Sequence, residues 1–318
     1  MDALFTPTLI IQKEPWELEL FDELKEGWDV RRKRIKPGRV DVGVSLFNTQ
    51  RLQFSSVSYS NAIMIEGSPP KNTVMISIIQ SNDGYLFCNQ MRKGYEIIIS
   101  RYGDDVDYIA KDYNTIITFA IEEHYFCEMF FYYFEQTLEE FLAGHRAVIK
   151  ESLLSRFLSQ MESWIVFFQQ DKRVFSPEAY KNMEDEMLEA LFSIIVVQKK
   201  QNKEIKQSLI KARELLQDNI KNIYSISDLT KEINISSRTL QYQFKTTFGF
   251  TPKEYFNYMR LNAIREELKL RCCEEGLKIS DIALKYSFFN LSHFSYQYKK
   301  MFDETPSQTL RRFYAKNI

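Results

Sequence analysis

Two stretches near the C-terminal end of the chain decide its fold: FKTTFGFTPKEYF at residues 244–256 and YKKMFDETPSQTL at residues 298–310. Each begins with an aromatic residue and a lysine, places a phenylalanine four residues after that aromatic, and continues to Thr-Pro. The whole chain has 318 residues, which is enough for two domains with their own cores. The repetition predicts two similar structural units in the last third of the chain.

The similarity extends upstream of these stretches. ISDLTKEINIS from Ile226 aligns with ISDIALKYSFFN from Ile279 at an offset of 53 residues, and the offset is 54 beyond that point. The second unit therefore has one extra residue in a turn. Each unit has the pattern of two short helices joined by a tight turn, so we predict two helix-turn-helix units.

In the first unit, we expect Ser227 to cap a helix that ends at Ile233, and Ser236 to cap the next helix, 237–248. Gly249 is expected to end that second helix. The spacing of four residues predicts that one face is buried, formed by Leu240, Phe244 and Phe248.

In the second unit, Ser280 is expected to cap the first helix, and the second helix is expected over residues 291–302. Its predicted buried side chains are Phe294, Tyr298 and Phe302. Between the units, a helix that starts at Pro252 and continues to about residue 270 would span about 28 Å at 1.5 Å per residue. This length approaches one turn of duplex DNA, so the second helices of both units could occupy successive major grooves.

The C-terminal sequence resembles the AraC/XylS-type bacterial transcription regulators, and it is similar to the ethanolamine-utilisation regulators in length and C-terminal pattern. The resemblance covers about 206–318 and is carried by SSRTLQYQFKTTFGFTPKEYFNYMRLNAI at 236–264 and IALKYSFFNLSHFSYQYKKMFDETPSQTLRR at 282–312. It implies an all-α domain with two helix-turn-helix units joined by a long helix. The base-reading positions implied are Arg238, Gln241, Tyr242, Ser292, Ser295 and Tyr296. The positions implied near the DNA backbone are Ser237, Lys245, Lys299 and Lys300.

Two positions depart from the family pattern. Ser287 lies in the second turn and Asp303 follows Phe302, where the family usually has glycine. Glycine at such positions relieves a positive φ angle. We therefore expect the second unit to fold but to hold its base contacts less firmly.

Charge is divided along the chain. From Lys206 to the end there are 19 Lys and Arg against 12 Asp and Glu, and residues 1–205 carry 23 against 31. Only the C-terminal third is basic. Basic side chains gain affinity by displacing counterions from phosphates, so double-stranded promoter DNA is the expected partner of this part.

The N-terminal part predicts a different architecture, so the whole chain is expected to be α+β. Strand-like runs fill 42–121, which favours a small β-barrel or sandwich, and helical periodicity follows over 123–197. The helices are expected at 126–142, 153–168 and 178–198. The polar stretch 198–207 is the expected linker, which leaves 1–197 as an N-terminal domain and 208–318 as a DNA-binding domain. By resemblance, the N-terminal domain would be a cupin-like sensor whose helices form a homodimer.

Other functions are disfavoured by what the sequence lacks. Its three histidines are dispersed, so neither a metal site nor a cofactor is expected, and neither is catalysis. No apolar run has the length of a membrane span and no export signal is recognised, so a cytoplasmic protein is expected. The expected partners besides DNA are an unknown small-molecule effector and, for an activator, RNA polymerase. Two alternatives stay open: a cupin-type enzyme with a regulatory tail, and a protein-interaction adaptor with degenerate DNA binding.

Overall fold

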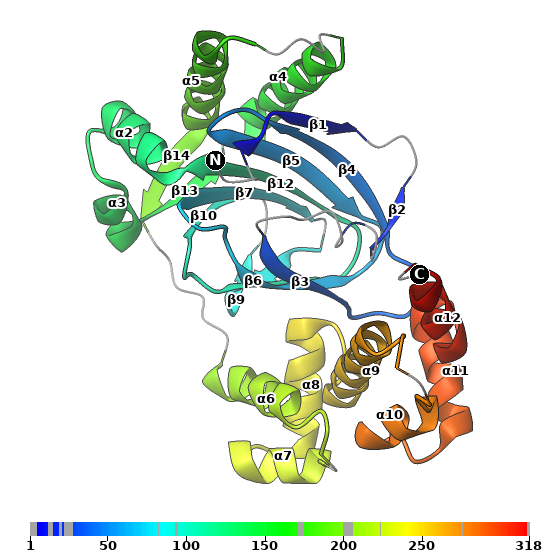
Figure 1. The fold of residues 1–318 in the computed structure, drawn as a ribbon. Coiled ribbons are helices and arrows are strands. Elements are labelled where there is room, and N and C mark those ends of the chain that lie inside the picture. Colours follow the sequence, from blue (N-terminus) through cyan, green and yellow to red (C-terminus); the bar gives the residue numbers. More distant parts are fainter. Residues whose placement is uncertain are drawn as a thin grey trace.

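The computed structural model describes residues 5–11, 15–18, 21, 28–81, 83–92, 95–149, 151–170, 175–199, 206–222, 224–274 and 276–316. Two antiparallel sheets lie between two groups of helices (Figure 1). One helical group comes from the middle of the chain and the other from its C-terminal third. The chain is therefore a mixed α and β protein with a helical C-terminal part, as expected.

The larger sheet has nine strands in the order β1-β4-β5-β12-β7-β10-β13-β14, with β2 paired to β4. Its strands are β1 (Thr8–Ile11), β2 (Trp16–Glu17), β4 (Asp41–Asn48), β5 (Leu52–Tyr59), β7 (Thr73–Ser81), β10 (Glu96–Arg101), β12 (Asn114–Glu122), β13 (His145–Ile149) and β14 (Ile195–Lys199). The smaller sheet has the order β3-β6-β11-β8-β9. Its strands are β3 (Asp29–Arg34), β6 (Ile63–Ser68), β8 (Tyr85–Phe87), β9 (Gln90–Arg92) and β11 (Val106–Ala110).

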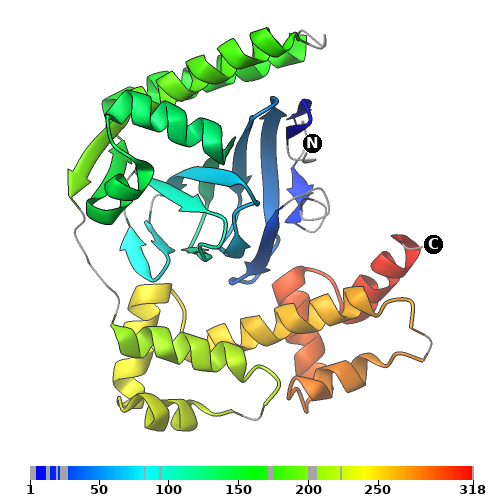
Figure 2. The ribbon, with the colours of Figure 1, turned by 60° about the vertical axis from the view of Figure 1, so that its left-hand side comes forward.

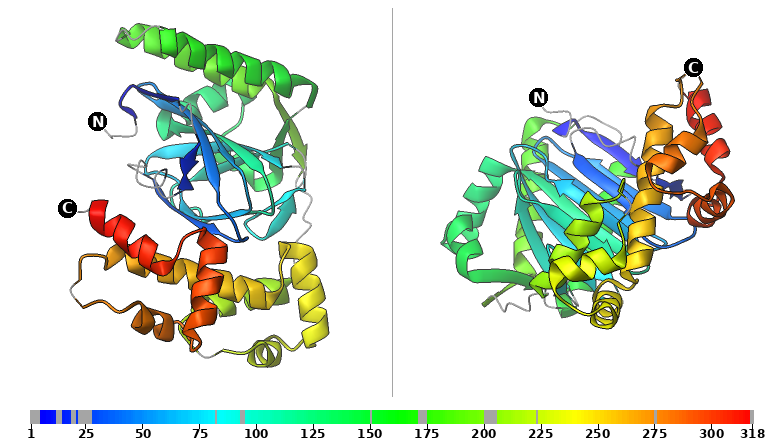
Figure 3. Two further views of the ribbon diagram at one scale, coloured as in Figure 1. Left: turned by 90° about the vertical axis from the view of Figure 1, so that its right-hand side faces the viewer. Right: turned by 90° about the horizontal axis from the view of Figure 1, so that it is seen from below.

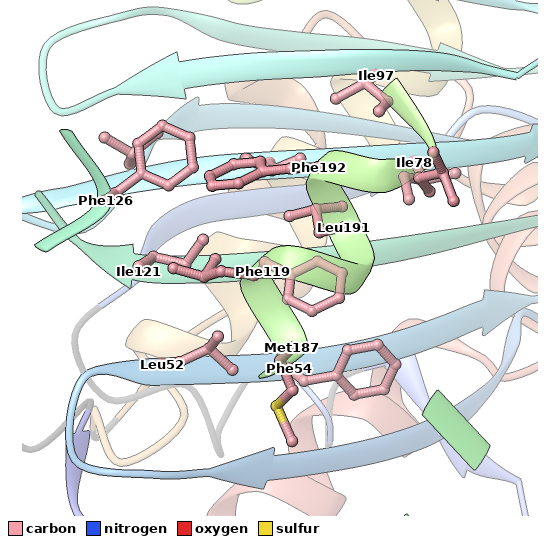
Figure 4. Close-up of a cluster of buried hydrophobic side chains, with 14 of the residues drawn as sticks. Leu52, Phe54, Ile78, Ile97, Phe119, Ile121, Phe126, Met187, Leu191 and Phe192 are labelled. Carbon is pink, nitrogen blue, oxygen red and sulfur yellow. The ribbon is translucent and has the colours of Figure 1, made fainter. Parts of the chain in front are cut away.

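The two sheets bury their facing sides against each other. Alternate residues of the strands point to opposite faces, so Val57 and Met75 of the larger sheet meet Ile65 and Tyr108 of the smaller one in a shared core. The opposite face of the larger sheet packs under helices α2 (Glu123–Phe134), α3 (Leu138–Gly144), α4 (Glu151–Gln170) and α5 (Pro177–Ser193). Figure 4 shows this second core, where Leu191 and Phe192 of α5 lie over Phe119 of β12.

Several expected boundaries in the N-terminal part are wrong. Strands also occur outside 42–121, since β1, β2 and β3 precede that range and β13 and β14 lie within or beyond the helical range 123–197. The sequences HRAVI and IVVQK of β13 and β14 contain β-branched residues, and these two strands pair with each other at the sheet edge.

The helix expected at 126–142 is two helices, because Glu135 adopts a left-handed conformation with φ of 54° that ends α2. The third helix stops at Ser193 rather than at 198. Residues 198 and 199 of the expected linker belong to β14, and residues 200–205 lie outside the described part of the chain.

The C-terminal third forms seven helices among the residues described: α6 (Gln207–Asp218), α7 (Ile226–Ile233), α8 (Ser237–Phe248), α9 (Pro252–Leu270), α10 (Ile279–Lys285), α11 (Leu291–Phe302) and α12 (Pro306–Lys316). They lie against the smaller sheet (Figures 1 and 2). Met64, Leu86 and Ile109 of that sheet share one buried cluster with Phe248 and Tyr255 of the helices. A continuous apolar interface therefore joins the two parts.

Polar contacts reinforce this interface. Arg213 of α6 forms an ion pair with Asp107 of β11, and both side chains are largely buried. Asn262 of α9 bonds to both backbone groups of Arg34 on β3: it accepts from the Arg34 N–H at 3.2 Å and donates to the Arg34 carbonyl at 2.8 Å. No helix among the residues described is long and apolar enough to cross a membrane.

Candidate nucleic-acid interface

Ser225 caps the first helix of the first helix-turn-helix unit, so the expectation that Ser227 caps it is wrong. The Ser225 hydroxyl accepts from the Asp228 N–H, and the Asp228 carboxylate accepts in return from the Ser225 N–H, so the two residues form a capping box. Ser227 lies inside the first turn, where its carbonyl accepts from the Thr230 hydroxyl. Only Ser225 has an acidic residue three positions later, and this pairing makes Ser225 the cap.

The second helix of this unit, α8, has the expected bounds and ends. Ser236 caps it by accepting from the Thr239 N–H at 3.1 Å. Gly249 ends it with φ of 88°, and its N–H donates to the Lys245 carbonyl. The predicted inward side chains Leu240, Phe244 and Phe248 are all fully buried. The turn before α8 uses Asn234 in the left-handed region with φ of 52°.

The second unit repeats this plan with different residues. Helix α10 begins after Lys278 without a side-chain cap, so the expectation that Ser280 caps it is wrong. Ser287 takes the left-handed position of Asn234 with φ of 63°, and the Phe288 N–H donates to the Ala283 carbonyl, as in a Schellman motif. Asn290 caps α11 by accepting from the His293 N–H. Two residues separate Ser287 from this cap where one separates Asn234 from Ser236, which confirms the extra turn residue.

The two Thr-Pro sequences start the helices that follow. Thr251 forms a capping box with Glu254, and Pro252 occupies the first turn of α9. In the second unit, the Thr305 N–H donates to the Gln308 side chain, and the Gln308 N–H donates to the Thr305 hydroxyl. Asp303 has φ of 59° and gives its N–H to the Lys299 carbonyl. Both non-glycine positions noted in the sequence are therefore left-handed, and both helices of the unit form.

Helix α9 holds the two units apart and in register. Its 19 residues span about 28 Å at 1.5 Å per residue. Helices α8 and α11 run in the same direction on either side of it, with their N-terminal ends away from the sheets (Figures 2 and 3). Near the end of α9, the Glu267 carboxylate accepts from Lys285 and Tyr286 of the α10 segment and from Arg271. Burial alone would raise the pKa of Glu267, but these hydrogen bonds outweigh it and lower the pKa.

The predicted DNA-contacting residues lie on the outer faces of α8 and α11. Tyr242 is 73% exposed and Tyr296 is 66% exposed. The others are also solvent-exposed: Ser237, Arg238, Gln241, Lys245, Ser292, Ser295, Lys299 and Lys300. Arg238, Gln241, Tyr242 and Lys245 occupy the same places in α8 as Ser292, Ser295, Tyr296 and Lys299 in α11, at the repeat offset of 54. The two helices thus present equivalent polar faces to solvent.

Two contacts from the sheets to these helices were not predicted. Lys111, before β12, donates to the Thr246 carbonyl of α8 at 3.2 Å. Arg34 of β3 donates to the Phe302 carbonyl of α11 at 3.4 Å. Both contacts join residues more than 130 positions apart, so no local sequence pattern could have indicated them.

Comparison with known proteins agrees with this geometry. Residues 229–312 match the family model described as a helix-turn-helix domain. A curated relative, the XylDLEGF operon transcriptional activator 3 of Pseudomonas putida, is 33% identical over 99 residues. The C-terminal domain is of the AraC/XylS type. The match spans 31% of this chain and 30% of that relative, so it concerns this AraC-type domain and not the sheets.

Two solved structures are similar to this chain at low TM-scores. A probable AraC family transcriptional regulator from Rhodopseudomonas palustris is 29% identical, with a TM-score of 0.32, over 34% of this chain and 98% of that one. ToxT from Vibrio cholerae is 14% identical, with a TM-score of 0.30, over 90% of this chain and 98% of that one. These TM-scores are low, so the assignment of the AraC-type domain rests on the sequence matches.

Proposed function

We propose that this chain is a transcription regulator that binds promoter DNA through helices α8 and α11. The observation that carries the proposal is the pair of equivalent polar faces on two parallel helices, joined by a helix about as long as one turn of the duplex. In the proposed complex, Arg238 pairs with a guanine and Gln241 with an adenine. Single hydrogen bonds to bases come from Tyr242, Ser292, Ser295 and Tyr296.

The phosphate contacts are assigned to the exposed residues Ser237, Lys245, Lys299 and Lys300. Ser237 lies at the N-terminal end of α8, where helix N–H groups favour an anion. Lysines at the later turns of both helices neutralise backbone charge without reading sequence. This division of roles makes the base-reading and phosphate-binding residues separable by experiment.

The test is fluorescence anisotropy with duplex from the promoter of the protein's own operon, at several salt concentrations, against a random duplex of equal length. Arg238→Ala should lose about 1–3 kcal/mol of discrimination at one base pair. Lys299→Ala should weaken binding to both duplexes equally and reduce the salt dependence. Equal affinity of the wild-type protein for both duplexes would reject the proposal, and unchanged discrimination by Arg238→Ala would reject that residue's role.

A small-molecule effector is proposed to bind between the two sheets, in a cupin-like N-terminal domain. A cavity of about 70 Å³ lies there, which is room for a few waters or a small organic group. Its lining is mostly apolar, and Arg32 is the one charged lining residue among those that the structure describes. Two positions along the same strand, Arg34 contacts both α9 and α11. A ligand that shifts β3 would therefore change how the sheets hold the DNA-binding helices.

Homodimerisation is proposed through the helices that cover the larger sheet. Leu154, Phe157 and Met161 of α4 face the core, whereas Val166 and Phe167 are more than one-third exposed near its end. Size-exclusion chromatography with light scattering tests this, since Val166→Glu should dissociate a dimer formed there.

As an activator, the protein would also contact RNA polymerase. The function of the AraC-type domain makes the enzyme and adaptor alternatives the weaker candidates.

A further inference from the structure

Two adjacent thiols lie in the connection between the helix-turn-helix units. Cys272 and Cys273 follow the last residues of α9, and their Sγ atoms are 3.7 Å apart. Neither takes part in a disulfide. Cys272 is 7% exposed, whereas Cys273 is solvent-exposed. A reagent can therefore reach the Cys273 sulfur from solvent, and the Cys272 sulfur lies directly beside it.

Ion pairs hold the turn that carries these thiols. Arg271 precedes the pair and Glu274 follows it, and their side chains form two hydrogen bonds of 2.6 and 2.9 Å. Arg271 also donates to Glu267 at 2.8 Å. Glu267 in turn is bound by Lys285 and Tyr286. The turn is thus fixed to both α9 and the α10 segment, so the two sulfurs are held close together before any ligand binds.

We propose that Cys272 and Cys273 form a binding site for monosubstituted trivalent arsenicals and for chemically similar thiophilic centres. The reaction is a condensation without redox change. An organoarsenic(III) oxide gives up its oxygen as one molecule of water, using the two thiol protons, and two arsenic–sulfur bonds form. Such an arsenical needs two sulfur ligands, which is the number that this turn supplies.

The geometry favours this chemistry over two others. Inorganic arsenite requires a third ligand, and no cluster of three His, Cys, Asp or Glu suited to holding a metal ion occurs among the residues described. A direct disulfide requires the sulfurs to approach to about 2.0 Å, from 3.7 Å in a turn closed by ion pairs. An arsenic atom that bridges the sulfurs leaves them apart and demands less movement.

The ionisation of the exposed thiol points the same way. The hydrogen bond with the Cys272 sulfur raises the pKa of Cys273. A raised pKa keeps the thiol protonated near neutral pH, and peroxides react with the thiolate form. Slow reaction with peroxide is therefore expected, whereas the condensation with an arsenical consumes the thiol protons as water.

The experiment uses the reduced full-length protein and phenylarsine oxide, followed by intact-protein mass spectrometry. The wild-type protein should take up one equivalent with loss of one water. Cys273→Ser should lose at least about 100-fold in affinity, because the second sulfur acts at high effective concentration only when both are present. The matched control is the double variant Cys88→Ser with Cys127→Ser, which should bind like the wild type.

Reversal separates chelation from simple thiol reaction. A dithiol such as 2,3-dimercaptopropanol should remove the adduct, whereas the same concentration of glutathione should not. Retention of the tight adduct by Cys273→Ser, its loss in the control variant, or equal reversal by glutathione would each overturn the proposal. Because Cys273 is exposed, its serine variant should fold normally, which a circular-dichroism melting curve checks. Cys272→Ser, at the buried position, provides a second test of the same loss.

Discussion

Removal of the Asn262 side chain should weaken the attachment of α9 to the smaller sheet. Asn262 accepts from the Arg34 N–H and donates to the Arg34 carbonyl, and the two residues are only 8% and 4% exposed. Asn262→Ala leaves both backbone groups without that partner, at a cost of about 1–3 kcal/mol each. A cleft of about 320 Å³ beside Asn262 gives water some access. We therefore expect a total loss near the lower end, about 2–3 kcal/mol.

The measurement is urea unfolding of the full-length protein followed by tryptophan fluorescence, since Trp28 immediately precedes β3. Asn257→Ala is the matched control. Asn257 is half-buried on the same helix and makes no side-chain hydrogen bond within the described part of the chain. Both changes raise helix propensity equally, so the difference between them reports the contact with β3 together with the hydrogen bond from the Asn262 side chain to the Tyr258 carbonyl. Equal free energies of unfolding for the two variants would refute the reasoning.

Three further predictions test the other structural arguments in the same unfolding assay. Glu267→Gln should lower the free energy of unfolding by about 1–3 kcal/mol at neutral pH. The pKa of Glu267 in the folded protein is lowered, below the usual value of about 4.3. The difference between the variant and the wild type should therefore vanish as the pH falls through that lowered pKa. Asp303→Gly should stabilise by up to about 1 kcal/mol because it removes left-handed strain, whereas Gly249→Ala should destabilise by about 1–2 kcal/mol. Arg213→Met should cost about 3 kcal/mol by leaving the buried carboxylate of Asp107 unpaired, and Asp107→Asn in the same chain should recover part of the loss.

The C-terminal domain was predictable because its determinants are local and occur twice. Four-residue spacing of aromatic side chains located α8 and α11, and glycine at 249 located the end of α8. The family resemblance also indicated positive φ angles at Ser287 and Asp303, where relatives usually have glycine, and both residues adopt them. The helix starts were less predictable, because Ser225 and Ser227 are both suitable caps and only the pairing with Asp228 distinguishes them.

The N-terminal part was predictable only in outline because its determinants are non-local. Helical periodicity continues through Glu135, and the break there depends on a left-handed residue of a type that rarely adopts it. The short strand β14 pairs with β13, which also pairs with β10, and 45 residues separate the end of β13 from the start of β14. The proposed DNA-contacting residues depend on a separate molecule as their partner, so their assignment came from the family resemblance and stays a prediction.

The contacts of the sheets with α8 and α11 bear on the regulation proposed above. A helix leaves its last carbonyl groups without intrahelical partners and favours a cation at that end. Lys111 reaches the last turns of α8, and Arg34 reaches the last residue of α11. Two basic residues of the N-terminal part, whose net charge is negative, thus contact the same feature of both helix-turn-helix units. Since the two residues belong to one pair of packed sheets, a shift of those sheets would act on both helices together and change their relative placement on DNA.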